Sequence, residues 1–166
     1  THIVVYNRNS NNIILINKCS CFFLVIMRIN INEICLHNLF NNTIIARIDK
    51  GEEILEKIKE IALNENIKLA NINALGAVNN FTVGVFKTAE KKYYSNEFSG
   101  DFEIVSLTGS INTMNGDFYS HLHMSAGDGE GKVFGGHLNR AIVSATCEMF
   151  INIIDAFIHI LRFCQK

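Results

Sequence analysis

The chain has no tryptophan, no proline and no excess of either charge. The missing proline rules out every motif that needs one. Lys and Arg number 15 against 16 Asp and Glu, so the formal net charge is −1. A protein that coats nucleic acid usually carries a clear excess of cations, because phosphates are bound by clustered Lys and Arg. The composition, 48% apolar and 19% charged, is typical of an ordinary globular protein.

Cysteine spacing and the length of the apolar runs exclude two further classes. The cysteines are odd in number and show no Cys-x-x-Cys pair, so neither a disulfide framework nor a thiolate zinc site is expected. No apolar run reaches the roughly 18–20 residues that a membrane helix needs. We therefore predict a cytoplasmic protein without a membrane segment. The cysteines are Cys19, Cys21, Cys35, Cys147 and Cys164.

The length of 166 residues fits one domain with a real core. Residues 1–26 combine Asn-rich sequence with an irregular apolar pattern. We expect them to form an N-terminal extension outside the domain, and residues 27–166, from Met27 onward, to form a single domain.

Hydrophobic periodicity predicts one clear helix among many strands. Residues 52–64 place Ile54, Ile58 and Ile61 at helical spacing, with Glu residues in the first turn. Residues 156–166 also show helical spacing, although a strand fits there as well. Gly76 suggests a bulge or a close approach of the backbone, and Cys147 is expected to be a small buried residue. Turn signals at residues 79–80, 99–101 and 115–116 separate the predicted strands, and residues 138–141 are expected to form one turn. These strands cover residues 43–48, 66–78, 81–86, 91–98, 102–111, 118–125 and 142–154.

This element order predicts an α+β fold, a mostly antiparallel sheet of about seven strands with a helix packed on one face. The other sheet face would remain apolar and wet in a monomer. Subunit association would cover it, so we expect an oligomer.

Residues 121–137 hold three of the six histidines. His121 and His123 lie on the same face of a predicted strand, because side chains alternate along an extended chain. Glycines at 127, 129 and 131 allow the chain to double back and bring His137 close to that pair. Three neutral imidazoles suit a divalent metal, with zinc as the favoured ion and the fourth coordination position open.

A second interpretation of this stretch needs no metal. A His-x-His pair on a strand is often a polar face that meets solvent, and Gly135-Gly136 is also consistent with a simple turn. If a metal is bound, Glu103 and Glu148 are candidate bases near bound water.

Five motifs in order resemble the plant and prokaryote conserved (PPC) domain family, over residues 43–154. They begin with Lys50-Gly51-Glu52-Glu53-Ile54 and Ala74-Leu75-Gly76-Ala77-Val78, and continue with Gly100-Asp101-Phe102-Glu103-Ile104-Val105-Ser106-Leu107-Thr108-Gly109. They end with His121-Leu122-His123 and Gly135-Gly136-His137-Leu138.

The resemblance implies a compact domain that assembles as a homotrimer and a role as a DNA-binding protein. In plants the domain accompanies an AT-hook. This chain has no proline and therefore no Arg-Gly-Arg-Pro core. The stretch of Gly100, Asp101, Phe102, Glu103, Ile104 and Val105 matches a family motif tied to partner contact, with Asp101 in place of the basic residue.

Three functions follow as hypotheses. The first is a DNA-associated regulatory protein without an AT-hook, whose DNA binding is weak and non-specific because the charges balance. The second is a metal-dependent enzyme or binder of a small-molecule ligand. The third is a structural trimer that recruits other proteins.

Overall fold

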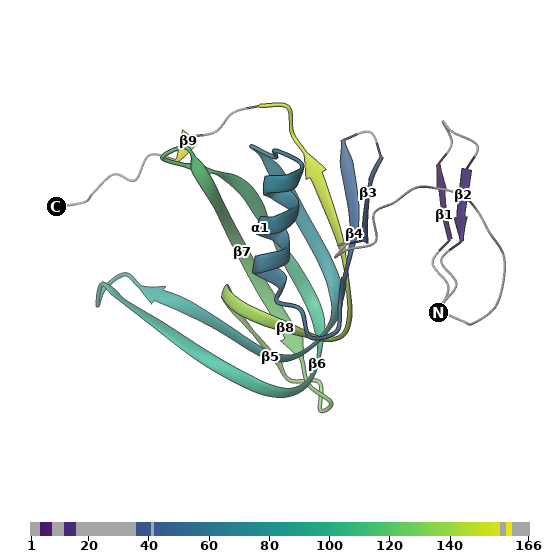
Figure 1. Ribbon diagram of the computed structural model, residues 1–166. Coiled ribbons are helices and arrows are strands. Elements are labelled where there is room, and N and C mark those ends of the chain that lie inside the picture. Colours follow the sequence, from purple (N-terminus) through teal and green to yellow (C-terminus); the bar gives the residue numbers. More distant parts are fainter. Residues whose placement is uncertain (1–3, 8–11, 16–35, 41, 157–158, 161–166) are drawn as a thin grey trace. The chain divides into compact units, whose positions relative to one another are not determined.

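Five long strands and one helix make up most of the structure (Figure 1). The structure is a computed structural model, and it describes residues 4–7, 12–15, 36–40, 42–156 and 159–160. Two short strands, β3 (Leu36–Phe40) and β9 (His159–Ile160), extend the sheet. The long strands and the helix are β4 (Thr43–Asp49), α1 (Ile54–Asn64), β5 (Ala70–Lys87), β6 (Lys92–Met114), β7 (Asp117–Gly127) and β8 (Val133–Ile153).

The chain divides into two units, Thr1–Ile34 and Cys35–Lys166. In the first unit the described residues form an antiparallel pair, β1 (Val4–Asn7) and β2 (Asn12–Leu15). The prediction that residues 1–26 form an extension falls largely outside the described residues. Among the described residues, no helix is long and apolar enough to cross a membrane.

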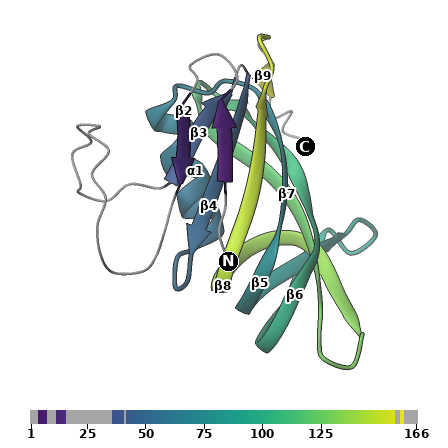
Figure 2. The same cartoon turned by 90° about the vertical axis from the view of Figure 1, so that its right-hand side faces the viewer.

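The sheet of the second unit has the strand order β3-β4-β8-β5-β6-β7, and β7 pairs in addition with β8. Every pairing is antiparallel except that of β9 with β6. Because β8 pairs with β7 and β5 near its start, the strands β8, β5, β6 and β7 close into a ring. The bend of these long strands is visible in Figure 2.

The predicted α+β class, with a mostly antiparallel sheet and one helix, is confirmed. The body of the sheet has only five strands, fewer than the seven predicted, and the sheet reaches seven only with β3 and β9. The predicted turns at residues 79–80, 99–101 and 138–141 lie inside β5, β6 and β8. Pairing with neighbouring strands keeps the chain extended at these positions. The register of the pairing shifts there, so the chain forms irregularities within a strand in place of the predicted turns.

Helix α1 was predicted over residues 52–64 and is confirmed. It packs across one face of the sheet (Figure 1). Its buried side chains are Ile54, Ile58, Ile61 and Ala62, which recur at the spacing of one helical face. They belong to one core cluster with Ile44, Ala46 and Ile48 of β4, which are at most 1% exposed. The burial of these apolar side chains is the main force that holds helix and sheet together.

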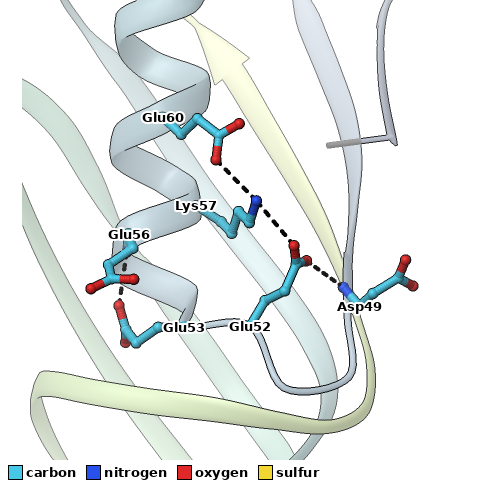
Figure 3. Close-up of polar contacts among 6 residues, drawn as sticks. All are labelled: Asp49, Glu52, Glu53, Glu56, Lys57 and Glu60. Atoms are coloured by element: carbon cyan, nitrogen blue, oxygen red, sulfur yellow. Dashed lines mark hydrogen bonds and ion pairs between the residues drawn. The ribbon is translucent and has the colours of Figure 1, made fainter. Parts of the chain in front are cut away.

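The turn before α1 carries a network of ion pairs (Figure 3). Lys57 Nζ lies 3.0 Å from carboxylate oxygens of both Glu52 and Glu60. Glu52 also accepts a hydrogen bond from the Asp49 backbone N–H at 2.8 Å. The hydrogen bond to Glu52, followed by that to Glu60, raises the pKa of Lys57 above its ordinary value. These contacts fix the chain between β4 and the helix.

Close backbone contact between β5 and β8 requires Gly76. Its φ is +147°, and a Cβ there would fall on the Thr146 carbonyl and lie 2.7 Å from Cys147 Cα. The sequence predicted either a bulge or a close approach at this glycine, and both occur, since the register shifts between Ala74 and Gly76. Cys147 is a fully buried free thiol, as predicted, and burial raises its pKa to about 12.

Candidate metal centre

Strand β7 presents His121 and His123 on the outer face of the sheet. The alternation of an extended chain turns Leu122 and Met124 inward, where they are 1% and 2% exposed. Both histidines are exposed. The buried neighbours anchor the strand, so the two imidazoles project from a rigid support. The predicted hairpin at Asn115 is confirmed, with φ of +56° at this residue, as the turn requires.

A tight turn then brings β8 back alongside β7. Asp128 Oδ1 accepts hydrogen bonds from the backbone N–H groups of Glu130 and Lys132, each at 2.9 Å. Gly131 adopts a φ of +80°, which favours glycine. The register that results places His137 directly opposite His123. The predicted return of His137 to the first pair is thus confirmed.

The three imidazoles form one compact group. Ring centroids lie 5.3 Å apart for His121 and His123, 5.1 Å for His121 and His137, and 5.7 Å for His123 and His137. One potential ligand nitrogen from each ring lies within 4.8 Å of the other two. Tetrahedral zinc with bonds of about 2.0–2.1 Å separates its ligand nitrogens by about 3.4 Å. Small rotations of the imidazole rings would bring the nitrogens to that spacing, so the residues fit such an ion.

The electrostatics of the group also suit a cation. Burial, followed by the charges of His121 and His123, lowers the pKa of His137 below its ordinary value. A lowered pKa keeps the imidazole neutral, and a neutral imidazole is the form that binds a metal. The donor set contains three nitrogens and no thiolate. Imidazole donors of this kind suit zinc, copper, iron and nickel rather than calcium or magnesium.

Neither candidate base belongs to this group of ligand atoms. Glu103 lies on β6 opposite Gly127, which is four residues, or about 13 Å, along β7 from His123. Glu148 lies opposite Arg47 on β4 and Leu75 on β5, and β5 and β6 separate that part of β8 from β7. The structure therefore places both carboxylates away from the imidazoles.

The predicted partner-contact motif, residues 100–105, lies in β6 and alternates between the two faces. Phe102 and Ile104 belong to the core, at 9% and 6% exposed. Asp101, Glu103 and Val105 face outward, and Val105 is 62% exposed. Only these three side chains of the motif are available to a partner.

Tyr93 is a neighbour of the centre that the sequence analysis missed. Its ring lies edge-on to that of His137, with centroids 6.3 Å apart. Its hydroxyl donates a hydrogen bond to Asn139 Oδ1 at 2.7 Å. No spacing rule points to this residue, because it reaches His137 only through the pairing of β6 with β5 and of β5 with β8.

Solved structures with the same fold come from bacteria and archaea. A PPC protein from Pyrococcus horikoshii is 31% identical, with a TM-score of 0.66, and the match covers 77% of this chain and 89% of that one. A metal-containing protein from Archaeoglobus fulgidus is 28% identical, with a TM-score of 0.66, and 76% and 88% covered. A "putative DNA binding protein" from Bacteroides thetaiotaomicron is 28% identical, with a TM-score of 0.72, and 74% and 85% covered.

A search of curated protein sequences finds no match to this chain. The family model of the Plants and Prokaryotes Conserved (PCC) domain matches residues 38–155. That span includes α1, the five long strands and all three histidines of the centre. The resemblance seen in the five sequence motifs is thereby confirmed, and the chain belongs to the PPC domain family.

Proposed function

We propose that this chain is a metal-binding PPC-domain protein in which His121, His123 and His137 hold one divalent ion. The observation that carries the proposal is the convergence of the three ligand nitrogens within 4.8 Å, from two strands whose register fixes them. The metal-containing relative from Archaeoglobus fulgidus supports it. Zinc is the favoured ion, because three neutral imidazoles are a known catalytic zinc set that leaves a fourth position open.

The function that fits such a centre best is that of a metal-dependent binder or enzyme acting on a small molecule. An ion with an open position acts as a Lewis acid that polarises an oxygen atom of a bound ligand. The chain itself supplies the rigid placement of the three rings, through the buried Leu122 and Met124 beneath them and the pairing of β7 with β8. The distances of Glu103 and Glu148 argue against either as a base beside the ion.

A homotrimer is proposed as the assembled form. Large apolar side chains remain exposed in the described part of the chain, and subunit contact would cover them. Leu75, Val105 and Val133 are 55%, 62% and 55% exposed, and Phe150 is 42% exposed. Light scattering at micromolar concentration should report three chains per particle. A monomer would reject this assembly.

Association with DNA is the second candidate function, supported by the description of the Bacteroides relative. Several cations of this chain already have partners. Lys132 pairs with Glu130, Lys87 pairs with Glu90, and Arg140 bonds to Asn80. Lys and Arg number 15 against 16 Asp and Glu, so we expect binding that is weak, non-specific and lost as salt rises. Tight binding to one sequence at physiological salt would contradict this expectation and favour a regulatory role.

Metal analysis of single-histidine variants tests the metal site. The parent, His121→Ala, His123→Ala and His137→Ala proteins are dialysed against zinc, freed of excess ion and measured for metal per chain. His37→Ala is the matched control, because His37 lies on strand β3 at the sheet edge. The parent and the control should retain about one ion per chain, and the three variants should lose it while they stay folded. A parent that takes up no zinc would refute the proposal.

A further inference from the structure

The side chains around the three-histidine group are polar and uncharged. Across the strands, Thr108 lies opposite His123, Ser110 lies opposite His121, and Gly84 lies opposite His137. The residues two positions along each strand from a histidine lie on the same face as that histidine. They are Tyr119, Ser125 and Asn139. None of these residues has an ionisable carboxylate or an amine that could balance the charge of a bound ion.

Because these neighbours are uncharged, they do not neutralise any of the charge of a bound divalent ion. Neutral imidazoles donate electron pairs to the ion and bring no negative charge. A bound ion is the largest local charge of such a site and governs what binds beside it. On an exposed face, an ion with two uncompensated charges attracts an anion to its open position.

Two hydroxyl groups stand beside this position on β6. In paired strands, Cβ atoms of opposite residues are about 4.5–5.5 Å apart, so the hydroxyls of Thr108 and Ser110 lie next to the rings of His123 and His121. Ser110 Oγ accepts a hydrogen bond from Asn112 Nδ2 at 3.3 Å, and Asn112 is 5% exposed. This bond uses a lone pair of Ser110 and leaves its O–H free to donate.

The ring of Tyr93 lies on the opposite side of the three-histidine group. A Cβ at Gly84 would fall on the Tyr93 hydroxyl, which shows that the end of the ring lies over this glycine, beside His137. The Tyr93 hydroxyl is already engaged with Asn139. The hydroxyls of Thr108 and Ser110 are therefore the available hydrogen-bond donors on one side of the histidines. On the other side, the aromatic ring of Tyr93 lies over β5.

We infer that the open position of the proposed metal centre takes a small oxyanion, and that Thr108 and Ser110 donate hydrogen bonds to it. The inference rests on the proposed function and adds a ligand class to it. The shared chemistry is an anionic oxygen cluster, which a small organic carboxylate and a phosphate group both offer. Charged acceptors strengthen such hydrogen bonds, so the two hydroxyls select oxyanions over neutral ligands of the ion.

Cobalt(II) provides the readout, because it is bound by imidazole nitrogens and its visible spectrum reports the ligands of the ion. The cobalt-loaded protein is titrated with acetate, inorganic phosphate and, as a neutral ligand, imidazole. The variants are Thr108→Val and Ser110→Ala. Thr146→Val is the matched control, since this exposed threonine lies nine residues along β8 from His137.

Acetate, phosphate or both should change the spectrum with a saturable curve. Each hydroxyl variant should bind the anion about tenfold more weakly, the usual loss for one hydrogen bond to a charged group, with imidazole binding unchanged. The control should match the parent. A response to acetate alone identifies the carboxylate, and a response to phosphate alone identifies the phosphate group.

The inference is overturned if cobalt binds and neither anion changes the spectrum, or if both hydroxyl variants bind anions as tightly as the parent. These results leave the metal site intact. By contrast, a protein that takes up no metal refutes the proposed function itself, so the two failures are distinguishable.

Discussion

Glu53 joins helix α1 to the strand that carries His137, and its removal should destabilise the domain measurably. One carboxylate oxygen caps the helix by accepting from the Glu56 backbone N–H at 2.8 Å (Figure 3). The other accepts from the Ala141 backbone N–H, also at 2.8 Å. Loss of a helix cap costs about 1 kcal/mol. A part-buried N–H left without a partner costs about 1–3 kcal/mol more.

The Glu53→Ala variant should therefore lose about 2–4 kcal/mol of the free energy of unfolding. For a domain of this size, 1 kcal/mol lowers Tm by roughly 3–5 °C, so Tm should fall by roughly 10 °C. Urea unfolding followed by circular dichroism measures the loss. Glu53→Gln keeps one acceptor oxygen and should fall in between.

The control is Glu56→Ala, which removes an exposed carboxylate from the same helical turn and should cost less than about 1 kcal/mol. If Glu53→Ala were no less stable than Glu56→Ala, the link between α1 and β8 would contribute nothing. The reasoning from these two hydrogen bonds would then be refuted.

Three further predictions concern the centre and the chain around it. Gly84→Ala should displace Tyr93 and cost about 1–3 kcal/mol in urea unfolding, whereas Tyr93→Ala combined with it should restore part of the loss. Because the pKa of His137 is lowered in the folded state, the unfolded chain takes up the proton more readily, so the metal-free protein should lose stability as pH drops below about 6.5. Urea unfolding at pH 7.5 and 5.5 should show this drop, and a drop of equal size in His137→Ala would contradict its assignment to this residue. A chain that begins at Met27 should melt within a few degrees of the full chain, and loss of folding would show that the preceding residues support the domain.

The centre was predictable because its geometry is local. Side chains alternate between faces along a strand, so His121 and His123 share one face. The glycine turn is short, and β8 begins only ten residues after His123. Only the register between the two strands had to come from the structure. The helix was equally predictable, since Ile54, Ile58 and Ile61 mark one buried face.

The strand boundaries were not predictable in the same way. Asn79-Asn80 has the composition of a turn, yet β5 continues through it because β6 and β8 pair with its two edges. That pairing involves residues more than 15 positions apart, which no local pattern encodes. For the same reason Tyr93 was missed. The helical spacing of residues 156–166 falls mostly outside the described residues, and the described pair His159–Ile160 forms strand β9.

X-ray absorption at the zinc edge of the zinc-loaded protein tests the central claim most directly, because it counts and identifies the atoms bound to the ion. Three imidazoles and an open position predict a first shell of nitrogen and oxygen neighbours at about 2.0–2.1 Å, with the outer-shell scattering of three histidine rings. His123→Ala should lose this signature. A sulfur neighbour at about 2.3 Å, or a shell of oxygens without imidazole scattering, would contradict the assignment of the three histidines as ligands.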